Sequence, residues 1–297
     1  MLDANISVFS ICSTSDISWH TLSALFEYHR PSENKVDVET STPPVLSIEG
    51  PIATIRLNRP AQANRIEPED LQVLTDHCAQ ISADHSVRAV ILTGTGKHFS
   101  AGADLTKMMQ GRSADTDTGH VANPFGQMVN AVEALPQPVI CALNGGIYGG
   151  ATDLALACDL RLAVPSVKMF MPAARLGLHY YLDGMRRYVS RLGFNTAKRL
   201  FLFAETLDAE EMLATGFIDR IVPVESLHDA ALEAAHTVAG MAPLAVQGMK
   251  AALNDLAQDR LDAEAFARQE TRCLRSEDLQ EGVTAWNEKR PPRFQAK

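Results

Sequence analysis

Apolar residues follow two different spacings in the first strands that the chain predicts. Residues 45–49 and 53–57 alternate apolar and polar side chains on either side of Gly50-Pro51, which predicts two strands joined as a hairpin. Further along, the apolar residues become continuous, as expected for strands that are buried on both faces of a sheet. Such buried strands are predicted at 89–93 and 139–143, and a further strand is predicted at 160–164.

Helical spacing separates these strands and continues after them. Between Glu67 and Ala83 the apolar residues recur on one helical face, at Leu71, Leu74, Cys78 and Ile81. Further helices are predicted at 125–135, 150–158, 185–204, 208–216, 226–240 and 243–258, and within 263–286. The stretch from Gly111 to Gly119, rich in Gly, Asp and Thr, predicts a mobile loop. Buried strands that alternate with helices, followed by a helical C-terminal third, indicate an α/β fold with a helical appendage.

The first 44 residues differ from the rest of the chain. They mix Ser, Thr and Asp with isolated aromatic residues and end in the run Ser41-Thr42-Pro43-Pro44. Such a segment predicts an arm that is partly disordered and carries no chemistry. We therefore expect an arm at 1–44, an α/β core at 45–225 and a helical region at 226–297.

Composition and charge exclude several classes of protein. The chain has 297 residues, of which 46% are hydrophobic and 21% charged, as in soluble globular proteins. The 27 basic and 36 acidic residues give a net charge of −9. Lys and Arg form no basic stripe, so we expect no nucleic-acid partner. An anionic ligand would need a local pocket, because the chain as a whole repels it.

The cysteines give no sign of a disulfide scaffold or a metal site. The five are scattered, and no pair has CxxC or zinc-site spacing. Reduced thiols fit a cytoplasmic protein, and the first thirty residues or so lack a secretory signal. No apolar run approaches the ~18–20 residues of a membrane helix. We therefore expect a soluble cytoplasmic protein with neither a metal nor a membrane segment.

Two glycine-rich turns are the strongest candidates for chemistry. The first, HFSAGADL, runs from His98 to Leu105 after a predicted strand, and the second, NGGIYGGATD, runs from Asn144 to Asp153 into a predicted helix. Glycine lets the backbone approach a ligand, and N–H groups at a helix start point outward. If the fold brings the turns together, two N–H groups could bind one oxygen, as in an oxyanion hole. Each turn alone is explained as well by the needs of packing.

Dinucleotide and nucleotide binding do not fit these turns. The second turn contains no GxGxxG, and no GxxxxGK[ST] occurs anywhere in the chain. The sequence therefore predicts neither a Rossmann site nor a P-loop.

Taken together, the motifs resemble a known family. Four runs follow one another along the chain: FSAGADL, ALNGGIYGGATDLALACDLRLA, RLGL and SEDLQEGVTAWNEKRPPRF. In order and spacing they are similar to the motifs of the crotonase (enoyl-CoA hydratase/isomerase) superfamily. The resemblance covers roughly Val45 to Phe294. It implies a core of stacked ββα units with two nearly perpendicular sheets, and C-terminal helices that assemble a homotrimer or homohexamer.

The resemblance also implies a substrate and a binding site. Family members bind acyl-CoA thioesters, and the thioester oxygen would lie between the backbone N–H groups of Ala103 and Gly150. No cofactor is implied beyond the coenzyme A of the substrate. The remaining expected substrate contacts are Ala61, Ala63, Ser100, Ala101, Asp104, His179 and Lys289, and Lys289 would reach a CoA phosphate in its own or a neighbouring subunit.

The acid–base residues depart from the family pattern. Hydratases of this family use two glutamates, and this chain has Asp153 at the first position and Ala173 at the second. Alanine transfers no proton, and the aspartate carboxylate is set back by one methylene, a displacement of about 1 Å that matters in catalysis. Water addition by paired carboxylates, and isomerisation by the second glutamate, are therefore both in doubt.

The segment after Gly177 offers substitutes. It reads LHYYLDG, and ungapped counting places Tyr180 where methylmalonyl-CoA decarboxylases of this superfamily carry an active-site tyrosine. Those proteins carry histidine where this chain has Ala103, so the match is partial. Packing explains Tyr180 and Tyr181 equally well. The remaining polar residues have structural interpretations: Asp183 would pair with Arg186 or Arg187, while Glu133 and Asp159 would stabilise the fold.

The leading hypothesis is an acyl-CoA-processing enzyme of the enoyl-CoA hydratase/isomerase family that acts through an oxyanion-stabilised thioester enolate. Its catalytic residues would be Ala103, Gly150, Asp153 and Tyr180. One alternative is a decarboxylase of a malonyl-type acyl-CoA, which needs little proton machinery. The other is a degenerate acyl-CoA-binding protein that has lost the chemistry.

Overall fold

The computed structural model describes residues 41–110 and 123–297, apart from the side chains of residues 109 and 110. Nearly all of the expected arm at 1–44 and the loop expected from Gly111 to Gly119 lie outside the described residues. The described chain is α/β, as expected, and contains two sheets.

The larger sheet has six strands in the order β1-β2-β3-β4-β6-β9. Strands β1 and β2 form the expected antiparallel hairpin, and every later neighbour in this sheet is parallel. Strands β3 and β4 are completely buried, which explains their continuous apolar sequences. The strands span Val45–Glu49 (β1), Ile52–Leu57 (β2), Ala89–Gly94 (β3), Val139–Leu143 (β4), Leu160–Ala163 (β6) and Arg220–Ile221 (β9).

The family resemblance implied a second sheet, but the strands of this smaller sheet were not predicted from the sequence. It consists of β5 (Ile147–Tyr148), β7 (Lys168–Phe170) and β8 (Thr206–Asp208) in the order β5-β7-β8. Strands of two or three residues are too short to show an apolar period. Since β5 lies inside the second glycine turn, this sheet anchors the turn to the core.

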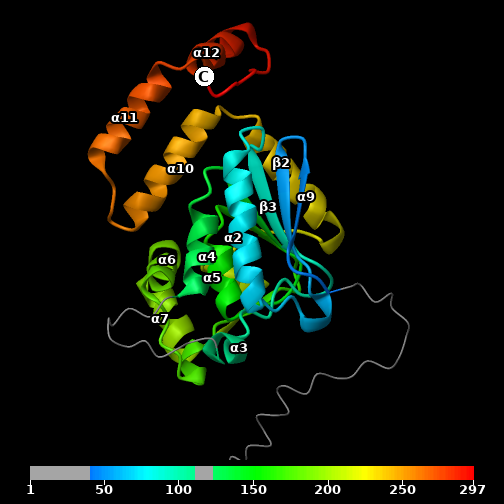
Figure 1. The fold of residues 1–297 in the computed structure, drawn as a ribbon. Helices are drawn as coiled ribbons and strands as arrows, with labels where there is room; N and C mark the ends of the chain where they lie inside the picture. Colours follow the sequence, from blue (N-terminus) through cyan, green and yellow to red (C-terminus); the bar gives the residue numbers. More distant parts are fainter. Residues whose placement is uncertain (1–40, 111–122) are drawn as a thin grey trace, which may run out of the picture. The chain divides into compact units, whose positions relative to one another are not determined.

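Helices cover both faces of the larger sheet. Helices α2 (Pro68–Ala83) and α4 (Pro124–Glu133) lie on one face and α9 (Leu227–Ala239) on the other (Figure 1). Helix α9 packs against β2, β3, β4 and β6, although it follows the expected domain boundary at residue 225. That division of the chain remains a prediction.

The helices near the second glycine turn have bounds that differ from the predicted ones. One helix was expected at 185–204, but α6 (Leu182–Leu192) and α7 (Phe194–Phe203) are separated at Gly193. Gly193 has a φ of 79°, which glycine adopts without penalty. The helices on either side of these two are α3 (Leu105–Gln110), α5 (Gly150–Leu156) and α8 (Ala209–Ala214).

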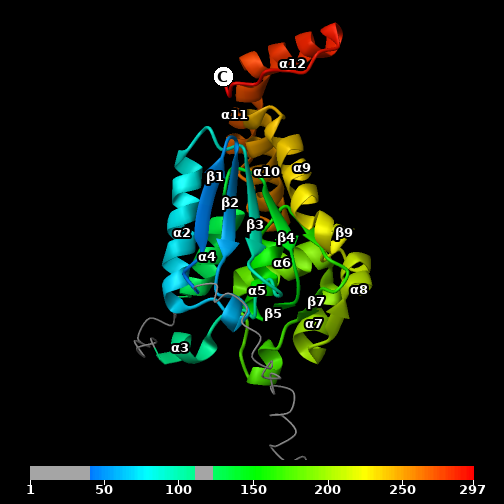
Figure 2. The same cartoon turned by 90° about the vertical axis from the view of Figure 1, so that its right-hand side faces the viewer.

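Three further helices follow α9. Helix α10 spans Pro243–Ala257, α11 spans Ala263–Leu274 and α12 spans Glu277–Glu288. Helix α11 packs on α10 and α12 on α11 (Figure 2). Helix α10 is joined to the core by an ion pair between Lys250 and Asp159, with 2.6 Å between Nζ and Oδ2. Within the described ranges, no helix is long and apolar enough to cross a membrane.

Candidate active site

The two glycine-rich turns lie side by side. Phe99 N–H donates to the carbonyl of Gly146 at 3.1 Å, and Tyr148 N–H donates to the carbonyl of Ser100 at 3.0 Å. A methyl group placed on Gly102 would lie 3.2 Å from the nitrogen of Gly150. The approach of the turns, which was an expectation from sequence, is therefore confirmed.

Two backbone N–H groups are left free where the turns meet. Ala103 forms a bridge to Ile66, in which Ile66 N–H donates to Gly102 and Asp104 N–H donates to Ile66, so the N–H of Ala103 itself is not used. Gly150 is the first residue of α5, where an N–H has no partner within the helix. In the described part of the chain, neither N–H donates to a backbone or side-chain oxygen.

The first turn is built on buried side chains. The Ser100 hydroxyl donates to Asn64 O at 2.7 Å and accepts from Gly102 N–H at 3.0 Å. The Asp104 carboxylate forms an ion pair with Arg65, 3.3 Å apart. The side chains of Ser100 and Asp104 thus hold the loop in shape. Of the other expected contacts near this turn, Ala61 is exposed, Ala63 is buried and Ala101 is half-buried.

Asp153 lies one turn into α5 and has no exposed surface. Arg187 of α6 holds both carboxylate oxygens, with Nε 2.9 Å from Oδ1 and Nη2 3.1 Å from Oδ2. The hydroxyl of Tyr181 donates to Oδ2 and also accepts from Arg187 Nη2 at 3.2 Å. Burial, followed by the charge of Asp153, raises the pKa of the Tyr181 hydroxyl. The hydroxyl therefore keeps its proton at neutral pH.

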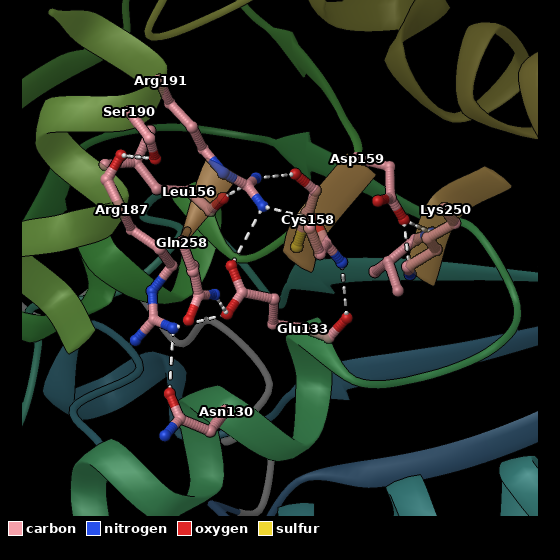
Figure 3. Close-up of polar contacts among 12 residues, drawn as sticks. Asn130, Glu133, Leu156, Cys158, Asp159, Arg187, Ser190, Arg191, Lys250 and Gln258 are labelled. Carbon is pink, nitrogen blue, oxygen red and sulfur yellow. Dashed lines mark hydrogen bonds and ion pairs between the residues drawn. The ribbon is translucent and has the colours of Figure 1, made fainter. Parts of the chain in front are cut away.

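Arg187 joins Asp153 to a second buried carboxylate. Its Nη1 lies 2.8 Å from Glu133 Oε2 and 2.9 Å from Asn130 Oδ1, both on α4 (Figure 3). Burial alone would lower the pKa of the guanidinium, but the hydrogen bond and charge of Asp153 outweigh it and raise that pKa. Arg187 is therefore a permanent cation between two carboxylates.

Glu133 also receives hydrogen bonds from α6 and α10. Arg191 Nη2 is 3.1 Å from Oε1, and Gln258 Nε2 donates to Oε2 at 3.0 Å (Figure 3). The backbone carbonyl of Glu133 accepts from Asn254 at 3.2 Å. We call Asp153, Arg187, Glu133 and Arg191 the ion cluster. It contains two carboxylates and two guanidinium groups, so its charges balance.

Tyr180 is buried beside Asp153. A methyl group on Gly184 would collide with the Tyr180 ring and would lie 2.9 Å from Asp153 Oδ2. Among the described residues, the Tyr180 hydroxyl has no hydrogen-bond partner. Burial, followed by the charge of Asp153, raises the pKa of this hydroxyl, so it too keeps its proton.

The remaining sequence candidates lie apart from the ion cluster. Ala173 is buried and supplies no proton-transfer group. His179 is exposed, and its Nδ1 lies 2.8 Å from the carbonyl of Tyr180. Asp183 pairs with Arg186 at 3.7 Å and not with Arg187, which settles the alternative left open by the sequence. Lys289 is exposed at the end of α12.

Sequence reasoning missed Arg187 and Tyr181 as members of the site. Glu133 was expected to be structural, and its place in the ion cluster was not foreseen. Arg187 lies four residues before Arg191 in an exposed-looking polar helix, yet its side chain is almost fully buried. A signal was present, because a buried Asp153 needs a cation and Arg187 lies on the helix that follows Tyr181. Within the described ranges, no cluster of His, Cys, Asp and Glu could hold a metal ion.

Comparisons with known proteins agree with this fold. The model of the Enoyl-CoA hydratase/isomerase family matches residues 47–297. The short-chain-enoyl-CoA hydratase of Clostridium acetobutylicum is 33% identical over 254 residues, covering 83% of this chain and 95% of that protein. The crotonyl-CoA hydratase of Syntrophomonas wolfei is 32% identical over 264 residues, covering 85% of this chain and 98% of that protein.

A solved structure agrees as well. The enoyl-CoA hydratase of Bacillus anthracis is 32% identical, with a TM-score of 0.77 over 86% of this chain and 100% of that one. The family model matches most of the chain, and the matches to the relatives span nearly the whole length of those proteins. This chain therefore has the crotonase fold and belongs to the enoyl-CoA hydratase/isomerase family of enzymes.

Proposed function

We propose that the protein acts on an acyl-CoA thioester by forming an enolate whose oxygen is held by the N–H groups of Ala103 and Gly150. The observation that carries this proposal is the pair of free N–H groups where the two glycine turns meet. Donors placed in advance where charge develops are often the largest single contribution to such reactions, and one donor contributes about 3–4 kcal/mol in other enzymes. The substrate class agrees with the names of the hydratases that the chain resembles.

The proton-transfer group is Tyr181 supported by Asp153. Asp153 has no exposed surface and both of its oxygens are engaged, so a substrate does not touch it. Tyr181 is half-buried and its hydroxyl points at Asp153. A proton can therefore pass between substrate and carboxylate through this hydroxyl, while the ion pair with Arg187 holds the carboxylate in place.

In hydration, the oxygen of water bonds to C3 of an enoyl thioester as its proton passes to the Tyr181 oxygen. The Tyr181 proton passes to Asp153, and the electron pair of the C2–C3 double bond moves to the enolate. Return of one proton by the same route to C2 completes a 3-hydroxyacyl thioester. Isomerisation would use the same pair, taking a proton from C2 and returning it to C4.

A small panel of thioesters in D₂O tests the proposal. Crotonyl-CoA, a 3-enoyl-CoA, methylmalonyl-CoA and ethylmalonyl-CoA are incubated with the protein and followed by mass spectrometry. We expect crotonyl-CoA to gain heavy water, and we expect Asp153→Asn to lose this activity. Asp255→Asn, at an exposed ion pair with Arg260, controls for the substitution itself. An unchanged rate in Asp153→Asn would contradict the role of the carboxylate.

Decarboxylation of a malonyl-type thioester is the second candidate. It is favoured by the lack of an accessible carboxylate, since Ala173 replaces one and Asp153 is covered. The bond between C2 and the carbon of the free carboxylate would break, carbon dioxide would leave, and its bonding electron pair would form the enolate, which then takes one proton at C2. The buried Tyr180 hydroxyl, which lacks a partner in the described structure, could orient the departing carboxylate.

The same panel separates the candidates. Loss of carbon dioxide from methylmalonyl-CoA, with deuterium at C2, would replace hydration by decarboxylation and make Tyr180→Phe the next variant. Thioesters that bind without any change in mass would support the binding-only alternative instead. The expected contacts of the CoA moiety with Ala61, Ala63, Ala101 and Lys289 remain part of the proposal.

Assembly into homotrimers or homohexamers is also proposed. Helices α10 to α12 expose large apolar side chains, among them Leu253, Phe266, Leu274, Val283 and Trp286. Large apolar side chains exposed together on neighbouring helices indicate contact with another protein surface. Analytical ultracentrifugation should show a trimer or hexamer, and a monomer at micromolar concentration would contradict this assignment.

A further inference from the structure

Three glycines of the site each lie against an aromatic ring. A methyl group on Gly150 would lie 2.6 Å from Phe125 Cζ, and one on Gly126 would lie 3.0 Å from Tyr181 Cε2. A methyl group on Gly184 would collide with the Tyr180 ring. Since a side chain at any of these positions would displace the ring, glycine allows the rings to lie directly on the backbones of α4, α5 and α6.

The rings also pack on one another. Phe125 meets Tyr181 edge to face, with centroids 6.4 Å apart and planes at 77°. Tyr181 lies against Tyr180, with centroids 4.7 Å apart, and Tyr180 lies against Phe201 at 5.3 Å. We call Phe125, Tyr181, Tyr180 and Phe201 the aromatic wall. Only Tyr181 is half-buried; the other three are buried.

The aromatic wall is held in place by the ion cluster. The Tyr181 hydroxyl bonds to Asp153 and to Arg187, so a shift of the ring would break charge-assisted hydrogen bonds. Behind Tyr180, Tyr188 is buried, packs on Phe201 at 4.6 Å and bonds through its hydroxyl to Thr152. The aromatic wall therefore cannot move aside for a ligand without breaking buried hydrogen bonds.

The wall borders the atoms of the acyl group. Under the proposed function, the thioester carbonyl lies at the nitrogen of Gly150, and Phe125 contacts this same residue. The acyl carbons that follow the carbonyl must also reach the Tyr181 hydroxyl. Tyr180 packs against Tyr181, and Phe201 packs in turn against Tyr180. We propose that Phe125 and Tyr181 close the acyl pocket and restrict the substrate to short acyl chains; this proposal rests on the proposed function.

Binding of saturated acyl-CoAs tests the wall independently of catalysis. Calorimetry with butyryl-CoA and octanoyl-CoA gives a ratio of affinities for the unchanged protein, for Phe125→Ala and for Phe203→Ala. Phe203 is an exposed phenylalanine of α7 and controls for loss of a ring. We expect the unchanged protein to prefer butyryl-CoA, and we expect Phe125→Ala to shift the ratio toward octanoyl-CoA by about 10- to 100-fold, because the added methylenes become buried.

The outcomes separate the wall from the proposed function. Equal or tighter binding of octanoyl-CoA by the unchanged protein, or an unchanged ratio in Phe125→Ala, would overturn the role of the wall while leaving acyl-CoA binding in place. Failure of every acyl-CoA to bind would overturn the proposed function and the wall with it. If Phe125→Ala does not fold, Phe125→Leu should still shift the ratio in the same direction, by a smaller factor.

Discussion

The two halves of the candidate site use different chemical groups. The oxyanion half uses backbone N–H groups of two turns, fixed by hydrogen bonds between the turns. The proton-transfer half uses side chains from α4, α5, α6 and the segment around Tyr181, joined through the ion cluster. The first half is set by local chain geometry, whereas the second depends on which partners meet after folding.

This difference has an energetic consequence. A backbone donor keeps its place when one side chain is altered, because the surrounding turn is held by many bonds. In the ion cluster each charge is compensated by its neighbours, so removing one leaves another buried and unpaired. Substitutions in the ion cluster should therefore affect stability and activity together, whereas changes to the oxyanion half should affect binding and catalysis with little change in stability.

The largest effect is expected from Arg187→Met. The substitution leaves Asp153 and Glu133 buried without their shared cation, and we expect the free energy of unfolding to fall by about 3–5 kcal/mol. Urea denaturation measures the change. Arg186→Met is the matched control, since Arg186 is half exposed and its pair with Asp183 is 3.7 Å long; a loss of at most about 1 kcal/mol is expected there. Equal losses in both variants would show that the ion cluster does not stabilise the fold.

A smaller effect is expected from Glu133→Gln. The amide keeps the shape and one acceptor oxygen, but Arg191 then loses its carboxylate partner and Arg187 keeps only Asp153. We expect a loss of about 2–3 kcal/mol, as for hydrogen bonds to charged groups. Asp255→Asn, whose partner Arg260 is exposed, should lose less than about 1 kcal/mol in the same denaturation experiment.

The oxyanion half can be tested without altering the protein. S-butyl-CoA, a thioether, lacks the carbonyl oxygen that butyryl-CoA would place between Ala103 and Gly150. Two hydrogen bonds of about 1 kcal/mol each predict roughly 30-fold weaker binding of the thioether by calorimetry. Identical affinities would show that the two N–H groups do not bind the thioester oxygen.

The smallest effect concerns Glu281, a half-buried carboxylate outside the ion cluster. Hydrogen bonds from Arg290 and the backbone of Arg293 lower the pKa of Glu281 to about 2. Because the folded-state pKa lies below the ordinary value near 4.3, the contribution to stability is present above that value and is lost as the pH falls through about 2. Titration of the carboxyl by NMR should show this midpoint, and a midpoint near the ordinary value would contradict it.

The sequence predicted those parts of the molecule that depend on local patterns. The hairpin of β1 and β2 and the buried strands β3 and β4 follow from apolar spacing, whereas the approach of the two glycine turns was implied by the family resemblance. The break at Gly193 and the strands β5, β7 and β8 were not predicted, because each is too short to change the pattern of apolar residues. The partners of Asp153 were missed, because Arg187 lies 34 residues away in sequence and its inward orientation is signalled only by the need of a buried carboxylate for a cation.

A double-mutant cycle tests most directly the claim that Asp153 acts through Tyr181. The rate of crotonyl-CoA hydration is measured in the unchanged protein, in Asp153→Asn, in Tyr181→Phe and in the double variant. Each single substitution should lower the rate by about 100-fold or more, and the double variant should be no slower than the slower single one, because the two groups act as a unit. Losses that multiply in the double variant, or full activity in either single variant, would contradict the account.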